Sequence, residues 1–393
     1  VAPAGSWLAA ADSPLVGGGT VRIWDTATGK TFHTLTGHSD PVTALAIAPD
    51  GSWLASADRP LLGGGTVRIW NPATGATRQI LTGHITPVTA LQVAPDGTGL
   101  ASAHATSHGG GGGEVHIWNP TTGHTLHTFT GHTGGVLALA VAPDGSWLAS
   151  VDSPAGGSTV RIWNPAPGQG HPAISGHTSP VTALAVAPDS SWLASADSPS
   201  LGGGTIRVWD RATGQTRHTL TAHTSGVTAL AIAPDSTWLA SASGDGTVRT
   251  WNPTPGQRRH TLIGHTSRVA VLAIAPDGSW LASADHPSGG GGAVRIWDPI
   301  TGETRRTLTG HTAGVSALAV APDGSWLASA DRPTNEGGTV RIRDTTTGQT
   351  RHVLSGHTSG VSALAVAPDG TWLASADHPI DGAGTVRVWD TTT

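Results

Sequence analysis

The chain has 393 residues, of which 37% are hydrophobic and 12% charged, and it contains 55 glycines, 16 tryptophans and no cysteine. A formal net charge of only -5 excludes both a disordered polyelectrolyte and a strongly basic nucleic-acid binder. The lack of cysteine excludes a disulfide framework, thiolate chemistry and any cysteine-ligated zinc site.

A long apolar helix or a signal peptide would direct the protein into or across a membrane. No apolar run reaches the ~18 residues that a membrane-spanning helix needs, and the first residues, V-A-P-A-G, do not resemble a signal peptide. We therefore expect a cytoplasmic protein without membrane contact. Because the chain begins without methionine, we also expect it to be a piece of a longer protein.

In chain order, residues 1–36 predict three short strands, and the first complete unit then starts at Gly37-His38. V-T-A-L-A-I-A at 42–48 is apolar on both alternating faces and predicts an inner strand that is covered on both sides. The P-D-G turn at 49–51 reverses it.

Three further segments complete the unit. S-W-L-A-S at 52–56 and T-V-R-I-W at 66–70 predict the second and third strands, and a glycine-rich loop joins them. The fourth segment alternates polar and apolar residues, as T-F-H-T-L-T does at 31–36, and predicts an outer strand with one wet face.

The same unit recurs along the whole chain. The in-register histidines are spaced by 46, 48, 45, 46, 42, 46 and 46 residues, and Ala222-His223 is a decayed copy of Gly-His. Tryptophans occur only in two repeating positions, one before the second strand and one that closes the third. The repeating positions predict structural residues: His38, His84, His132, His177, His223, His265, His311, His357, Trp24, Trp70, Trp118, Trp163, Trp209, Trp251, Trp297 and Trp389.

The Gly-His to Trp-Asp unit resembles the WD-repeat family, in the highly repetitive form found in bacteria, and the resemblance covers essentially the whole chain. It implies an all-β fold, a β-propeller of four-stranded antiparallel blades in a single domain at 1–393. Nine partial or complete units favour nine blades with the first and last incomplete. Eight blades stay an alternative if the strand at 361–367 completes the first blade. Gly99 and Arg343 each replace a tryptophan and predict a local weakness.

The resemblance also implies a hydrogen-bonded set of His, Ser or Thr, Asp and Trp in each unit. Only the unit with His223, Ser241, Asp245 and Trp251 keeps the short turn that places its aspartate. Elsewhere an aspartate at the end of the second strand is expected to take that place: Asp12, Asp58, Asp152, Asp197, Asp285, Asp331 and Asp377.

Patterns that suggest chemistry are better explained by the repeat. No metal, cofactor or catalytic residue is expected, because the histidines, turn aspartates and Gly29-Lys30-Thr31 follow the repeat, and the sequence contains no G-x-S-x-G or H-E-x-x-H. The glycine runs at 109–113 and 289–292 are interpreted as flexible connectors. His104, His108 and His116 form an unusual local cluster, and metal binding there stays an alternative.

Arginine recurs two residues before the third-strand tryptophan and again on the outer strand, and a single lysine accompanies twenty arginines. We expect these arginines to cover apolar strand surface and to pair with turn aspartates. Nucleic acid is therefore an unlikely partner.

The loops between the second and third strands differ most in sequence from one repeat to the next. We expect them to share one face with the Gly-His loops and to bind a protein or peptide. The candidate binding residues are Leu15, Arg59, Leu61, Leu62, Leu201, His286, Arg332, Glu336, His378, Ile380 and Asp381.

The expected function is a non-catalytic interaction scaffold or sensor module of a larger bacterial signalling protein with flanking domains. A lectin-like binder of small ligands is one alternative, and it requires exposed tryptophans at the Trp7 and Trp53 positions. A purely architectural or engineered ring is another.

Overall fold

The structure is a computed structural model, and it describes residues 1–14, 17–61, 63–104, 112–152, 157–164, 169–170, 174–254, 256–287, 289–332, 337–377 and 384–392. These residues form nine antiparallel sheets and two compact units. Unit 1 comprises residues 1–181 and 211–215, and unit 2 comprises residues 182–210 and 216–393. Among the residues described, no helix is long and apolar enough to cross a membrane.

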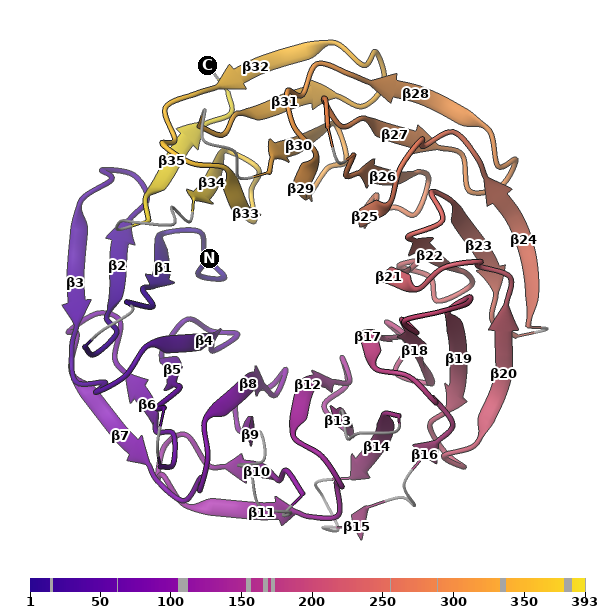
Figure 1. Cartoon of the computed structure of the whole chain (residues 1–393). Coiled ribbons are helices and arrows are strands. Elements are labelled where there is room, and N and C mark those ends of the chain that lie inside the picture. Colours follow the sequence, from indigo (N-terminus) through magenta and orange to yellow (C-terminus); the bar gives the residue numbers. More distant parts are fainter. Residues whose placement is uncertain are drawn as a thin grey trace. The chain divides into compact units, whose positions relative to one another are not determined.

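Unit 1 contains four sheets in chain order (Figure 1). The first two are built from β1 (Trp7–Ala11), β2 (Val21–Asp25) and β3 (Thr31–Leu35), and from β4 (Val42–Ile47), β5 (Leu54–Asp58), β6 (Val67–Trp70) and β7 (Thr77–Leu81). The next two are built from β8 (Val88–Val93), β9 (Leu100–His104), β10 (Val115–Trp118) and β11 (Thr125–Phe129), and from β12 (Val136–Val141), β13 (Leu148–Asp152), β14 (Thr159–Asn164), β15 (Gln169–Gly170) and β16 (Ile174–Ser175).

Unit 2 contains five sheets. They are built from β17 (Val181–Val186), β18 (Trp192–Asp197), β19 (Thr205–Asp210) and β20 (Thr216–Thr221); β21 (Val227–Ile232), β22 (Leu239–Ser243), β23 (Val248–Asn252) and β24 (Gln257–Leu262); β25 (Val269–Ile274), β26 (Leu281–Asp285), β27 (Val294–Trp297) and β28 (Thr304–Leu308); β29 (Val315–Val320), β30 (Trp326–Asp331), β31 (Val340–Asp344) and β32 (Thr350–Leu354); and β33 (Val361–Val366), β34 (Trp372–Asp377) and β35 (Val386–Asp390).

The fold is the all-β propeller of nine blades that the repeat predicts, with incomplete blades at both ends of the chain. The first blade, β1-β2-β3, lacks an inner strand, and the ninth, β33-β34-β35, lacks an outer one. The eight-blade alternative is wrong, because β33 pairs with β34 of its own blade, Leu364 opposite Ser375.

In the complete blades the second strand is more deeply buried than the inner strand. Every residue of β5 is buried, whereas most of β4 is only partly buried and β7 is largely exposed. The expectation that the inner strand is covered on both sides was therefore wrong, and the one-sided outer strand is confirmed. The physical reason is position in the sheet, since β4 is an edge strand while β5 lies between β4 and β6.

The apolar cores lie between successive blades of a unit. In unit 1, Trp53 and Ile69 of the second blade pack in one cluster with Leu100 and Trp118 of the third. In unit 2, Trp238 of the sixth blade shares a cluster with Leu281 and Trp297 of the seventh. Because each tryptophan removes a large apolar area from water at these contacts, it contributes on the order of 2 to 3 kcal/mol.

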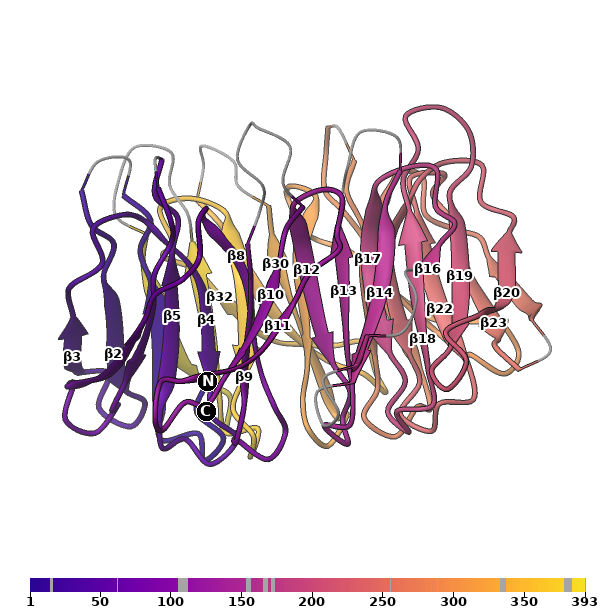
Figure 2. The same cartoon turned by 90° about the horizontal axis from the view of Figure 1, so that it is seen from below.

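The loops between second and third strands pack tightly against the Gly-His loops. In the side view the strands run up and down the page and their turns lie at two opposite edges (Figure 2). A Cβ atom added to Gly64 would lie 1.7 Å from the His84 carbonyl oxygen, and one added to Gly291 would lie 1.7 Å from that of His311. The interpretation of Gly289 to Gly292 as a flexible connector was therefore wrong at Gly291, which allows two backbones to touch. Gly109 to Gly111 lie outside the described residues.

Two glycines in the loop between β26 and β27 provide a test of whether close packing requires glycine there. We expect Gly291→Ala to lower the free energy of unfolding by about 1 to 3 kcal/mol, because the added methyl group meets backbone atoms. Gly289→Ala is the matched control, since its Cβ would meet nothing within 4 Å. Urea unfolding measures both variants, and equal stabilities would contradict the packing role of Gly291.

Gly99 leaves a pocket between the third and fourth blades, at the position where the other complete blades have a buried tryptophan. The pocket has a volume of about 250 Å³, and its lining includes Gly99, Ile117 and Trp147. The backbone there is unchanged, because Ala94 donates to the Gly99 carbonyl at 2.9 Å just as Ala48 donates to that of Trp53 at 3.0 Å. The sequence-based expectation of a local weakness at Gly99 therefore has a physical counterpart, which is unfilled space.

We expect Gly99→Trp to raise the free energy of unfolding by about 1 to 3 kcal/mol, because the indole would fill this pocket. A Cβ at this position meets only ordinary contacts, the nearest being Ala94 Cβ at 3.6 Å. Gly99→Ala is the control and gains little, since it fills little of the space. A Gly99→Trp protein that unfolds more readily than Gly99→Ala would show that the pocket cannot take the ring.

Arg343 replaces the third-strand tryptophan of the eighth blade and is itself buried, with 3% of its surface exposed. Its guanidinium donates to the Thr309 carbonyl, but its Nε and Nη1 atoms have no hydrogen-bond partner. Burial is the main cause that lowers the pKa of Arg343, and the neighbouring Arg341 adds to it. The eighth blade therefore holds a buried cation in place of apolar surface.

Candidate functional site

A buried hydrogen-bonded chain runs through each regular blade, and the second blade shows it in full. Trp70 Nε1 donates to Ser56 Oγ at 2.7 Å, and His38 Nε2 lies 2.7 Å from the same oxygen. His38 Nδ1 lies 2.9 Å from the Asp58 carboxylate. Since Ser56 accepts from Trp70, its own proton can go to His38 Nε2, and the His38 Nδ1 proton then goes to Asp58.

The aspartate at the end of the second strand substitutes for the missing turn aspartate in most blades with a long loop, as predicted. The prediction was wrong for Asp12 of the incomplete first blade, which accepts a hydrogen bond from Thr20 at 2.8 Å. The histidine Nδ1 to carboxylate distance is 3.0 Å for His132 and Asp152 and 3.1 Å for His265 and Asp285. Burial alone would raise the pKa of Asp152, but hydrogen bonds from His132 and Thr159 outweigh it and lower the pKa to about 2. The same contact joins His311 to Asp331 and His357 to Asp377.

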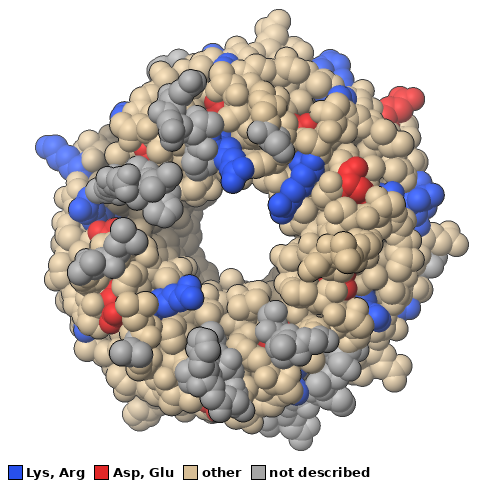
Figure 3. Space-filling model, in the orientation of Figure 1, with Lys and Arg blue, Asp and Glu red and all other residues tan. Residues whose placement is uncertain are grey.

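Third-strand arginines cover the tryptophans and bind backbone. The Arg68 guanidinium lies 5.8 Å from the Trp70 ring centroid and donates to the Gly37 carbonyl at 2.7 Å. Outer-strand arginines pair instead with the aspartate that ends the third strand, as Arg217 does with Asp210 at 2.5 Å. On the face shown in Figure 3, Lys and Arg side chains are mostly separated by uncharged residues.

The sixth blade uses a short turn and a different charge arrangement. Asp245 lies 3.1 Å from His223 Nδ1, as the family resemblance implies, and Arg249 contacts both residues. Burial is the main cause that lowers the pKa of His223 from 6.5 to about 4, and the Arg249 charge adds to it against the opposing effect of Asp245.

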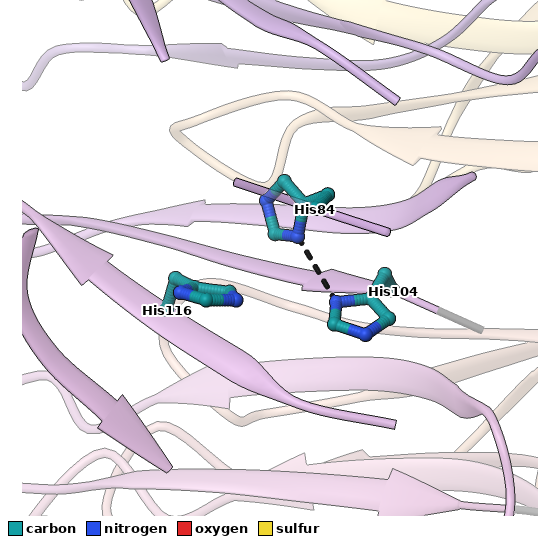
Figure 4. A group of neighbouring side chains, drawn as sticks. All are labelled: His84, His104 and His116. Atoms are coloured by element: carbon teal, nitrogen blue, oxygen red, sulfur yellow. Dashed lines mark hydrogen bonds between the residues drawn. The ribbon is translucent and has the colours of Figure 1, made fainter. Parts of the chain in front are cut away.

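The third blade departs from the pattern and gathers three imidazoles (Figure 4). His84, in the Gly-His position, contacts His104 at the end of β9, with 3.0 Å between their Nδ1 atoms. His116, on β10, completes a group in which one ring nitrogen from each residue lies within 4.8 Å of the others. All three side chains are buried.

The predicted loop residues that the structure describes lie at or near the surface. Leu61 and Leu201 are 95% and 92% exposed, Arg59 and Arg332 are exposed, and His286 is partly buried. The remaining candidates lie outside the described residues: Leu15, Leu62, Glu336, His378, Ile380 and Asp381.

A family model decides the relationship of this chain to known proteins. The model of the WD domain, G-beta repeat (WD40), matches residues 29–71, 75–119, 123–164, 170–210, 214–252, 256–298, 302–344 and 348–390. The chain belongs to the WD40 family. Each WD40 repeat is offset from a blade, since the match at 29–71 includes the outer strand β3 and the next three strands, β4 to β6.

One solved structure supports the fold independently of the family model. The crystal structure of the computationally designed Ika8 protein is similar to this WD40 chain with a TM-score of 0.64 and 28% sequence identity. The similarity covers 91% of this chain and 98% of that one. No curated protein matches the chain.

Sequence reasoning missed the imidazole cluster of this WD40 protein in two ways. It grouped His104 and His116 with His108, which lies outside the described residues, and it assigned His84 to the repeat alone. A signal was available, because the third unit has His104 where the other complete long-loop units have aspartate, and His116 where every other unit has arginine.

The WD40 hydrogen-bonded set of the sixth blade predicts acid sensitivity. The unfolded chain binds a proton at His223 near pH 6.5, whereas the folded chain does so near pH 4, so stability falls as the pH drops between these values. The loss amounts to up to about 3 kcal/mol for this buried residue. Urea unfolding across this range measures it.

Arg249→Gln should reduce that loss, because it removes a positive charge that lowers the pKa of His223. Arg295→Gln is the matched control in the seventh blade, where the guanidinium donates to the Gly264 carbonyl at 2.8 Å. An unchanged pH dependence in Arg249→Gln would rule out this electrostatic coupling.

Proposed function

We propose that this WD40 chain is a non-catalytic module that binds a protein or peptide through the loops between second and third strands. The observation that carries the proposal is the near-complete exposure of Leu61 and Leu201 on loops whose bases are fixed. WD40 propellers are generally scaffolds for protein interaction, and the proposal assigns that role to particular loops.

In unit 1, the loop that carries Leu61 is held at both ends. The Arg59 amide donates to the Pro41 carbonyl at 2.9 Å, and the Gly65 amide donates to the Thr86 carbonyl at 3.0 Å. Because both ends of the loop are fixed, a partner that covers Leu61 would gain apolar burial at a reduced cost in conformational entropy. The exposed Arg59 adds a positive charge that favours an acidic residue in the partner.

Unit 2 presents a comparable loop around Leu201. The Gly204 amide donates to the Ser225 carbonyl at 2.9 Å, and a Cβ on Gly203 would lie 1.9 Å from the His223 carbonyl oxygen. In the eighth blade, the Arg332 amide donates to the Gly314 carbonyl at 2.7 Å and leaves the side chain exposed. Unit 1 and unit 2 therefore each contain loops of this type with at least one end fixed by a backbone hydrogen bond.

Burial counts against catalysis by the Ser, His and Asp sets. Their connectivity resembles a hydrolytic triad, but Ser56 is 0% exposed and already accepts the Trp70 indole proton. A nucleophile must reach the substrate and must be activated by its base. These serines instead form hydrogen bonds with His and Trp side chains inside the blade.

The lectin-like alternative requires exposed indoles in adjacent blades, but all tryptophans before the second strands except Trp7 are buried. Trp53 is 6% exposed and Trp147 1%, and Trp7 is partly buried. A sugar ring could not stack on these faces without opening the contacts between blades.

We also propose that the chain is part of a larger bacterial signalling protein in the cytoplasm. The single lysine against twenty arginines, with abundant Ala, Gly and Pro, is typical of a GC-rich bacterial genome. A parent signalling protein with flanking domains, and a cytoplasmic location, are consistent with it.

Peptide selection against the full chain tests the interaction role. We expect the selected peptides to contain apolar residues beside an acidic one, and Leu61→Ser or Leu201→Ser to weaken the peptides that bind each loop by roughly tenfold. Ile300→Ser is the matched control, because Ile300 is 78% exposed but lies in the turn between β27 and β28. Peptides that bind both loop variants as tightly as the parent chain would refute the loop assignment.

A further inference from the structure

The third blade contains a set of side chains that the interaction role does not use. His84, His104 and His116 are 5%, 1% and 7% exposed, and they come from the Gly-His loop, β9 and β10. Their ligand nitrogens lie within 4.8 Å of one another (Figure 4). We propose that this cluster is a zinc-binding site in which each imidazole supplies one ligand nitrogen.

The other blades of the same chain serve as internal controls. At the positions of His104 and His116, the second blade has Asp58 and Arg68. In the third blade, two histidines that could bind a metal ion therefore replace the carboxylate and the guanidinium. A third change accompanies them, because Glu114 stands where the second blade has Thr66. All three changes fall around one Gly-His histidine.

The hydrogen bonding of the cluster is incomplete without a further partner. In the second blade the Nδ1 proton of the repeat histidine reaches a carboxylate, but in the third blade Nδ1 of His84 meets Nδ1 of His104. The two Nδ1 atoms face each other with no carboxylate between them, and a neutral imidazole carries only one N–H. His116 Nε2 is also buried and makes no hydrogen bond. A cation that accepts the lone pairs of these nitrogens would supply the missing partner.

Neighbouring groups can orient the rings toward an ion. Ser102 Oγ lies 2.8 Å from His84 Nε2 and can accept its proton, which leaves the Nδ1 lone pair for a metal. Thr128 Oγ1 lies 3.2 Å from His116 Nδ1, and the Glu114 carboxylate lies 3.4 Å from His116 Nε2. Glu114 is therefore close enough to balance the charge of a divalent ion or to complete its coordination.

The spacing of two of the three ligand nitrogens suits zinc. Nitrogen ligands lie about 2.0 to 2.1 Å from zinc, so two of them in a tetrahedral site are about 3.3 Å apart. The 3.0 Å between the Nδ1 atoms of His84 and His104 is close to that value. Three imidazoles beside a carboxylate, without thiolates, favour zinc or another late first-row ion over magnesium or calcium.

The protonation of the rings is compatible with this role. Burial is the main cause that lowers the pKa of His84 to about 3, and the neighbouring His116 and His104 add to it. Burial also lowers the pKa of His104 and of His116. Neutral imidazoles carry the lone pairs that a metal ion needs.

Calorimetric titration of the tag-free, chelator-treated full chain with zinc chloride tests the proposal. We expect a single tight zinc equivalent and a higher thermal unfolding midpoint when zinc is bound. Cobalt substitution should give the visible absorption of a tetrahedral ion.

The double variant His104→Asp, His116→Arg is the matched control, because it restores the residues of the second blade and should fold. It should bind zinc more than roughly a hundredfold more weakly. The reverse transfer, Asp58→His with Arg68→His and Thr66→Glu, should add a second zinc equivalent. Equal zinc binding by the parent chain and the folded double variant, or none by either, would overturn the proposal.

Discussion

A serine hydroxyl in the second strand is the interaction on which each regular blade depends. It accepts the indole N–H of the third strand and contacts the imidazole that precedes the inner strand, as Ser56 does between Trp70 and His38. One buried atom thus joins three segments that are separate in sequence. Since the serine is fully buried, loss of one partner would leave its hydroxyl with a single hydrogen bond and no access to water.

The departures from this pattern show how much variation a repeated blade accepts. The sixth blade moves its carboxylate to Asp245 on a shorter turn, and the eighth replaces the indole with the buried Arg343. The third blade keeps Ser102 and Trp118 but exchanges the aspartate for His104. Polar and charged side chains can therefore differ between blades that share the same apolar core, because the apolar contacts between blades carry most of the stabilisation.

The loops proposed for interaction and the site proposed for zinc lie at different depths of the molecule. Leu61 is almost fully exposed at a loop tip, whereas the three imidazoles of the third blade are buried beneath the surface. Glycines link the exposed loop to the buried cluster. Gly64, in the loop that carries Leu61, packs against the backbone of His84. The same close approach that fixes the interaction loop also fixes one side of the imidazole cluster.

The repeat spacing, the turn signals and the tryptophan positions determined the blades and their strand order, because these properties depend on local pattern. The resemblance to the family also indicated the carboxylate that binds the Gly-His histidine in regular blades, but not the exception in the third blade. Only the tertiary structure decided that the second strand is more deeply buried than the inner strand, since burial depends on the neighbours of a strand and not on its own composition. It also decided that His84 joins His104 and His116. Residues 20 and 32 positions apart meet there because antiparallel pairing returns the chain to the same edge of the blade.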